Sequence, residues 1–172
     1  AKADPDNNIT TFTSETEDGS QRLFTQNYQD NGDAKTLTLE GLHFYNSAWA
    51  VSWKKGDINI SNCTFDDSNL TFGDANTISV KSCKISNVTT PFTFIGSVDK
   101  IEIENVETEN VTSYFLSLYG SYGTYGEVYL SHVKTNNPIY INNNCDSISI
   151  VGCSFVTDMS FTCINVTVHG LN

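Results

Sequence analysis

The chain of 172 residues is long enough to bury the core of one ordinary domain, and its 20 acidic residues against 9 basic ones give a net charge of −11. This charge repels phosphate backbones and anionic lipid surfaces, so we expect no nucleic-acid partner. No apolar run reaches the roughly eighteen residues of a membrane-spanning helix, and we expect no membrane insertion.

The first 36 residues lack any repeated pattern. They carry Ile9, Phe12, Leu23 and Phe24 among polar residues. We expect residues 1–36 to form an N-terminal cap or a degenerate first coil. Residues 37–172 are then a single repeat domain, which we interpret as a fragment of a longer chain.

From residue 37 a short pattern occurs seven times. Its copies are LTLEGLHF from Leu37, INISNCTF from Ile58, ISVKSCKI from Ile78, IEIENVET from Ile101, VYLSHVKT from Val128, ISIVGCSF from Ile148 and VTVHGLN from Val166. The starts are 21, 20, 23, 27, 20 and 18 residues apart. Such a period predicts a solenoid, in which each unit buries its apolar side only by stacking on its neighbours.

Each copy begins as a strand and then bends. Its first and third residues are apolar with a polar residue between them, which is strand alternation. The fifth residue mostly tolerates a left-handed backbone, and the set is Gly41, Asn62, Ser82, Asn105, His132, Gly152 and Gly170. The sixth residue is always apolar and is expected to point inward, and the set is Leu42, Cys63, Cys83, Val106, Val133, Cys153 and Leu171.

A second apolar alternation follows in each unit, so each coil supplies three short strands. Its pairs are Trp49 and Val51, Leu70 and Phe72, Phe92 and Phe94, Leu116 and Leu118, Ile139 and Ile141, and Phe161 and Cys163.

Over residues 37–171 this pattern resembles the parallel β-helix of the pectin-lyase-like superfamily. The resemblance implies an all-β, right-handed parallel β-helix of about six to seven coils, each of 18–27 residues. A leucine-rich-repeat-like solenoid is the alternative, because LxLxxCxF also fits the strand of that repeat. An uncovered final coil favours end-to-end self-association.

The candidate catalytic and metal-binding residues are more typical of a structural role than of an active site. The superfamily includes polysaccharide lyases and polygalacturonases, but the NTD, GHG and RIK motifs of a polygalacturonase are missing and only Asp66-Asp67 and His169-Gly170 remain as fragments. We therefore expect no enzyme, no catalytic residue and no metal site. Calcium is the one cofactor left open, because acidic residues cluster in DKIEIENVETEN, where cross-strand lysines pair with Glu104 and Glu107. A disulfide between Cys145 and Cys163 also remains open.

The most irregular stretch is SYFLSLYGSYGTYGEVYL, residues 113–130. Its glycines predict a side loop, and tyrosines offer an apolar face with a polar tip, as sugar-binding and protein-binding surfaces do. The hypothesis of a ligand-binding site rests on Tyr114, Tyr119, Tyr122, Tyr125 and Tyr129.

The functional expectation is an adhesin-like or passenger-like module. Related β-helices act as rigid rods that display loops, so we expect an extracellular or cell-surface protein that binds a glycan or a host or cell-surface protein. The alternatives are a fragment of a polysaccharide lyase or hydrolase, and a structural spacer. One sequence does not decide among them.

Overall fold

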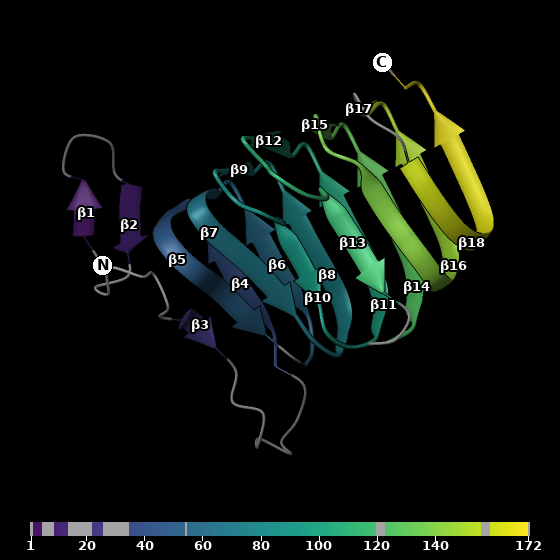
Figure 1. Ribbon diagram of the computed structural model, residues 1–172. Helices are drawn as coiled ribbons and strands as arrows, with labels where there is room; N and C mark the ends of the chain where they lie inside the picture. Colours follow the sequence, from purple (N-terminus) through teal and green to yellow (C-terminus); the bar gives the residue numbers. More distant parts are fainter. Residues whose placement is uncertain are drawn as a thin grey trace.

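The computed structural model describes residues 2–4, 9–13, 22–25, 35–53, 55–119, 123–155 and 159–171. These residues form strands, bends and turns and no helix, so none of them forms a helix long and apolar enough to cross a bilayer. The strands pair in parallel to build a β-solenoid of about six turns (Figure 1). The predicted parallel β-helix is therefore confirmed.

The coils form three parallel sheets. The first sheet contains β4 (Leu37–Glu40), β6 (Ile58–Ser61), β8 (Ala75–Lys81), β11 (Val98–Glu104), β14 (Tyr125–Ser131), and the later parts of β16 (Ile139–Val151) and β18 (Met159–His169). The second contains β2 (Ile9–Thr13), the first parts of β5 (Leu42–Trp53) and β7 (Thr64–Phe72), then β9 (Lys84–Ser86), β12 (Glu107–Glu109), β15 (Lys134–Thr135) and β17 (Ser154–Phe155).

The third sheet contains β3 (Arg22–Thr25), the later parts of β5 and β7, β10 (Phe92–Phe94), β13 (Leu116–Tyr119), and the first parts of β16 and β18. β1 (Lys2–Asp4) pairs antiparallel with β2. Because β2 and β3 pair with β5, the described part of residues 1–36 extends the second and third sheets.

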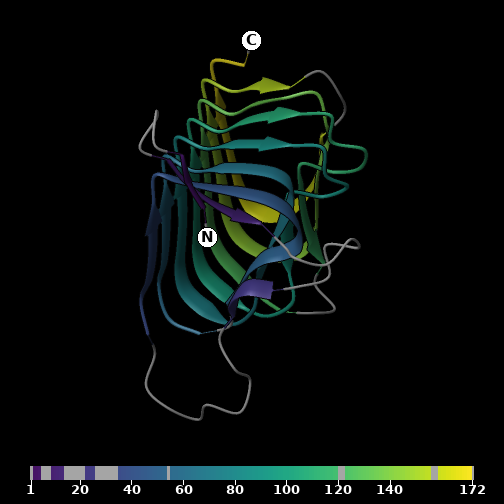
Figure 2. The same cartoon turned by 90° about the vertical axis from the view of Figure 1, so that its left-hand side faces the viewer.

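Figure 2 looks along the solenoid from its N-terminal end and shows the three sheets as sides of each coil. The chain runs up the first sheet, across the second and down the third while it recedes from the viewer. This is the right-handed winding expected for parallel crossover connections.

The bend at the fifth residue of each unit has the left-handed backbone conformation. The φ values lie between 52° and 65° at Gly41, Asn62, Ser82, Asn105, His132, Gly152 and Gly170. Glycine and asparagine reach this region at little cost, which explains why they recur here. The bend turns the chain from the first sheet into the second.

A second left-handed bend follows five residues later, and the sequence analysis did not identify it. It falls at Asn46, Asp67, Asn87 and Asn110, with φ between 50° and 57°. Side chains link the bends of neighbouring coils: Asn110 Nδ2 donates to Asn87 Oδ1 at 3.0 Å, and Asn87 Nδ2 donates to Asp66 Oδ1 at 2.6 Å. The Asn-Val-Thr sequences that begin at Asn87 and Asn110 thus have a structural origin as bends.

Coil length varies on one side only. The two bends are five residues apart in four coils, at 41 and 46, 62 and 67, 82 and 87, and 105 and 110. From the second bend to Ile58, Ile78, Ile101 and Val128 the distances are 12, 11, 14 and 18 residues. The first and second sheets are therefore constant, and the third sheet with its flanking turns absorbs the irregular spacing.

Equivalent side chains stack inside the solenoid. The register partners Phe44 and Phe65 lie parallel with ring centroids 4.7 Å apart. Phe92 packs edge-on at 5.4 Å against Phe115, which precedes its register partner Leu116. At the sixth position Cys63, Cys83, Val106, Val133 and Cys153 are buried, and Leu42 is half-buried. Leu171 was expected to point inward, but it is 44% exposed, because in the described structure no further coil stacks on this one.

Charges on the outer faces are matched between coils. Glu104 and Lys81 are register partners with 3.3 Å between Oε2 and Nζ, and Lys134 Nζ lies 2.6 Å from Glu107 Oε1. These two predicted cross-strand pairs are confirmed. Both pairs lie at the surface, where solvent screening keeps the contribution of an ion pair to stability small.

Two glycines test how closely the coils pack. A Cβ on Gly126 would overlap the backbone carbonyl oxygen of Asp99 in the adjacent coil, whereas a Cβ on Gly41 would meet no atom within 4 Å. We expect Gly41→Ala to lower the free energy of unfolding by about 1 kcal/mol, because the alanine must adopt a left-handed backbone conformation but meets no steric clash. We expect Gly126→Ala to cost about 3 kcal/mol, because backbone must move. Urea denaturation measures both, and equal losses would contradict this account of coil packing.

Candidate binding site

The structure separates the tyrosines of the predicted loop. Tyr114 and Tyr129 are half-buried, but they lie on different sides of the solenoid. Tyr119 ends β13, with its side chain outside the described part, and Tyr122 lies outside the described residues. The five residues therefore do not form one exposed cluster in the part of the chain that is described.

Tyr125 corrects the prediction directly, because it belongs to the core. Its side chain is 1% exposed and packs edge-on against Phe94, with ring centroids 6.2 Å apart. It begins β14 in register with Val98 and Cys145, at an inward position. Burial raises the pKa of its phenol to about 12. The glycines around Tyr125 suggested an exposed loop, but Gly126 instead permits close coil packing.

A row of hydroxyl-bearing residues crosses the outer face of the third sheet. It occupies equivalent register positions of β5, β7, β10, β13, β16 and β18, and its members are Ser52, Thr71, Thr93, Ser117, Tyr140 and Ser160. In β3 the register partner of Ser52 is Thr25, the last residue of that strand. Each member is the register partner of the next. Strand alternation turns them away from inward neighbours such as Leu116 and Leu118. We call these six residues the hydroxyl row.

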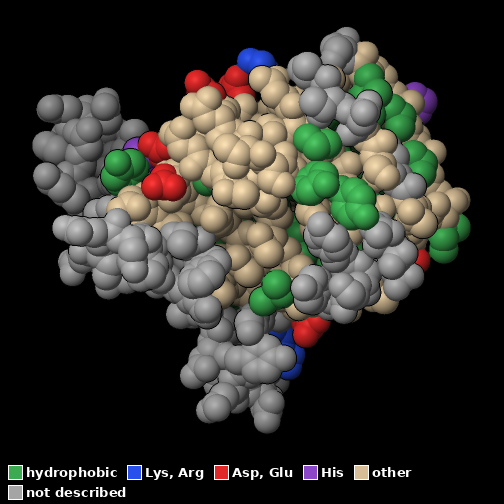
Figure 3. All heavy atoms as spheres, in the orientation of Figure 1, with side chains coloured by type: hydrophobic (Ala, Val, Ile, Leu, Met, Phe, Trp, Pro, Cys, Tyr) green, Lys and Arg blue, Asp and Glu red, His purple; other side chains and the backbone are tan. Residues whose placement is uncertain are grey.

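A groove of about 340 Å³ lies along this row between β10 and β13. Thr93 and Ser117 line it together with Tyr114 and Ile95. Tyr114 also packs against Tyr140 of the next coil in a tilted arrangement, with ring centroids 5.4 Å apart and a 38° interplanar angle. Figure 3 shows apolar side chains gathering among polar ones on this face, over the region of β13. The groove is therefore bordered by both aromatic and hydroxyl groups.

Two buried polar atoms on this face lack hydrogen-bond partners among the described residues. They are Ser117 Oγ, in the groove, and Asn69 Oδ1, two residues before Thr71 on the same face of β7. A buried polar atom without a partner costs about 1–3 kcal/mol. Such groups call for a ligand or a water to satisfy them.

Tyr129 lies on the outer face of the first sheet. It lines a separate hollow of about 310 Å³ with Lys100, Glu102 and Glu127. Lys100 Nζ lies 2.6 Å from Glu102 Oε1, and this pairing raises the pKa of Lys100 and lowers the pKa of Glu102. This hollow is charged, in contrast to the groove beside the hydroxyl row.

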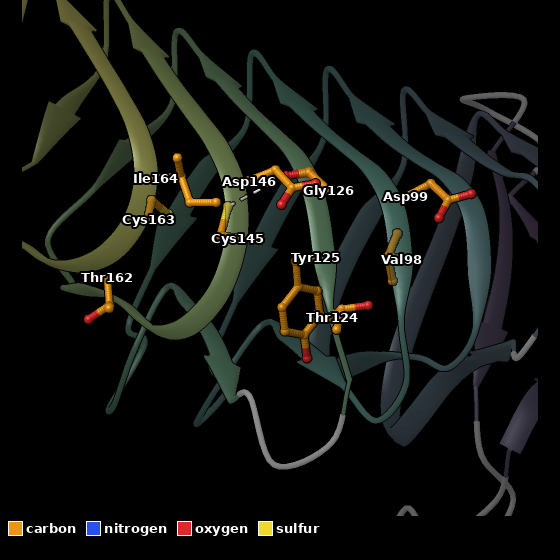
Figure 4. Close-up of a pocket in the computed structure, with 10 residues that line it drawn as sticks. All are labelled: Val98, Asp99, Thr124, Tyr125, Gly126, Cys145, Asp146, Thr162, Cys163 and Ile164. Carbon is orange, nitrogen blue, oxygen red and sulfur yellow. Dashed lines mark hydrogen bonds between the residues drawn. The ribbon is translucent and has the colours of Figure 1, made fainter.

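A third concavity, of about 640 Å³, lies where β11, β14, β16 and β18 enter the first sheet (Figure 4). Val98, Tyr125, Cys145 and Cys163 line it from four successive coils, and the Sγ of Cys145 donates to the Gly126 carbonyl at 3.7 Å. Asp99 and Asp146 stand at its edge. It combines core side chains with two separated carboxylates, whereas the groove combines aromatic rings with hydroxyls.

Metal ligands do not converge in the described part of the chain, where no group of three or more His, Cys, Asp or Glu side chains is placed to hold an ion. Comparison of the chain with protein-family models, with curated proteins and with solved structures finds no match. The functional argument therefore rests on the geometry of the solenoid.

The hydroxyl row escaped the sequence analysis for a specific reason. The predicted third-strand pairs were Trp49 with Val51 and Phe161 with Cys163, but the structure aligns Val51 with Leu70 and Met159 with Ile139. Register irregularities in β5 and β16 cause these shifts of two residues. With the correct register, the central residues are all hydroxyl-bearing, and that signal was present in the sequence.

The burial of Tyr125 predicts a stability loss at high pH. An unfolded tyrosine ionises near pH 10, but the folded pKa is about 12, so the folded state holds its proton longer. Between these values the free energy of unfolding falls by at most about 1.4 kcal/mol per pH unit, and below pH 10 the contribution is fully present. Phenolate absorbance should show one late-titrating tyrosine that is absent in Tyr125→Phe. A late step that persists in this variant contradicts the assignment.

Proposed function

We propose that this protein is an extracellular or cell-surface β-helical binding module that recognises a glycan through the hydroxyl row and its groove. The observation that carries the proposal is the six hydroxyl-bearing residues in register, one of which, Tyr140, packs against Tyr114. The proposal keeps the glycan ligand expected from the sequence and Tyr114 as a contact. It replaces the continuous tyrosine loop with a sheet face.

The chemistry of the groove matches a sugar. Hydroxyls both donate and accept hydrogen bonds, as sugar hydroxyls do, and a tyrosine ring offers an apolar surface to the C–H face of a pyranose. The groove is lined by Thr, Ser, Phe, Ile and Tyr, without a charged side chain. In a chain of net charge −11 this favours a neutral glycan over an ionic ligand.

The direction of the row favours an extended ligand. Successive members lie on adjacent strands, about 4.8 Å apart along the solenoid axis. A linear polysaccharide that lies along this axis meets the exposed Thr93 and Ser160 and the half-buried Tyr140, whereas Ser52, Thr71 and Ser117 are buried. Affinity therefore rises with chain length until the accessible members are covered. A protein partner is the alternative ligand, and it lacks this dependence on repeat number.

Three further proposals follow from the same argument. The module binds without turnover, since its best-formed surface offers hydroxyls and aromatic rings and no acid–base pair. It belongs with the non-catalytic, adhesin-like members of the pectin-lyase-like β-helices, on the strength of the resemblance in its repeats. The extracellular or cell-surface location follows from the same likeness to displayed β-helices.

The test compares variants on the two outer faces. Binding of neutral linear oligosaccharides of increasing length is measured by glycan array and then by calorimetry. We expect Tyr140→Ala to weaken binding tenfold or more, because it removes a stacking face. The matched control is Tyr129→Ala, a half-buried tyrosine on the first sheet, which should bind like wild type.

Ser117→Ala separates binding from folding. It removes a buried hydroxyl that has no partner among the described residues, so we expect unchanged or slightly higher stability with about fivefold weaker binding. Glycan binding that survives both Tyr140→Ala and Ser117→Ala, or is lost in Tyr129→Ala, would falsify the assigned face. Absence of any glycan binding by the folded wild type sinks the proposed function.

A further inference from the structure

Two pairs of cysteines stack in adjacent coils. Cys145 and Cys163 are register partners in β16 and β18, and Cys63 and Cys83 occupy the same position of neighbouring units. All five cysteines of the chain are free thiols. Equivalent positions on neighbouring parallel strands are about 4.8 Å apart, within the Cα separation that a disulfide spans.

The two pairs differ in access. Cys63 and Cys83 are 2% and 1% exposed, and the Cys63 thiol donates to the Ser61 carbonyl at 3.2 Å. Cys145 is also buried, but Cys163 is half-buried, and both line the concavity of about 640 Å³ (Figure 4). A small reagent can therefore reach the second pair through that concavity.

The backbone near the accessible pair also departs from regular strand geometry. The register between β16 and β18 shifts between Ile141 and Cys145, immediately before the pair. Regular in-register strands hold their Cβ atoms too nearly parallel for an unstrained disulfide, so an irregularity here eases closure.

We propose that Cys145 and Cys163 form a thiol–disulfide exchange site that reacts with a small disulfide such as oxidised glutathione and closes into an intercoil disulfide. The Cys163 thiolate attacks one sulfur of the reagent, forms a mixed disulfide and releases one glutathione thiolate. The Cys145 thiolate then attacks Cys163 Sγ and expels the second. Two protein thiols are oxidised, one reagent disulfide is reduced to two thiols, and the two protein protons pass to the released thiolates.

The bond joins β18 to the rest of the solenoid. Among the described residues β18 pairs with β16 alone, and Ile164, Val166 and Val168 are 79%, 48% and 39% exposed. The disulfide ties β18 covalently to β16 of the neighbouring coil and closes a loop of the chain, and it is expected to raise Tm by about 5–10 °C.

The test treats the folded full chain with oxidised glutathione and reads intact mass and disulfide-linked peptides. Wild type should lose two hydrogens and yield a Cys145–Cys163 peptide. Cys145→Ser should stop at one glutathione adduct on Cys163, and Cys63→Ser should behave like wild type. Circular dichroism checks that each variant is folded, and Cys145→Ala replaces Cys145→Ser if that variant does not fold.

The outcomes that overturn the proposal are equally specific. They are a Cys63–Cys83 disulfide in folded protein, stable adducts without closure in wild type, and no reaction under conditions that fully oxidise a model dithiol. An intercoil bond that forms without raising Tm overturns the stabilising role. None of these readouts depends on glycan binding, so this inference and the proposed function fail independently.

Discussion

The structure depends on one constraint, which is that each coil stacks in register on an equivalent coil about 4.8 Å away. A side chain therefore has its own counterpart as a neighbour, and what one coil places at a position the next must accept. Aromatic rings satisfy this by stacking, as Phe44 and Phe65 do. Like charges would repel each other at equivalent positions of neighbouring coils, so Lys81 pairs with Glu104 and Lys134 pairs with Glu107. Asparagine satisfies it by hydrogen bonding to asparagine, as Asn110 does to Asn87.

The same constraint turns a single polar residue per coil into a surface. A lone serine on a strand has little functional meaning, but six register-paired hydroxyls form a line whose direction is fixed by the axis of the solenoid. Tyr140, a member of this line, packs against Tyr114 and adds an apolar face. The axis of the solenoid sets the spacing of the hydroxyls, and the residue types in each coil set the chemistry of the surface. This combination suits a polymeric ligand.

The repeat made the fold predictable, because both its apolar positions and its bends are local features. Gly41, Asn62 and Asn105 reveal the left-handed bend through their own conformational preference. Tyr125 was misplaced, because an aromatic residue flanked by glycines has the same local sequence in a loop as in a tightly packed coil. The hydroxyl row depends on pairing between distant residues, and two register irregularities concealed it. The conformational preferences of single residues are enough to predict a coil. The hydroxyl row can be predicted only when the register between neighbouring coils is known.

The unequal spacing within the coils has an evolutionary consequence. The segment from the first bend to the second is five residues long wherever both bends are seen, while the segment after it ranges from 11 to 18 residues. An insertion before the second bend would throw later coils out of alignment, but one after it only lengthens a turn beside the third sheet. The geometry therefore leaves room for insertions on the flank that carries the hydroxyl row and not on the other two. Such insertions would change the surroundings of the row while the framework of the coils stays the same.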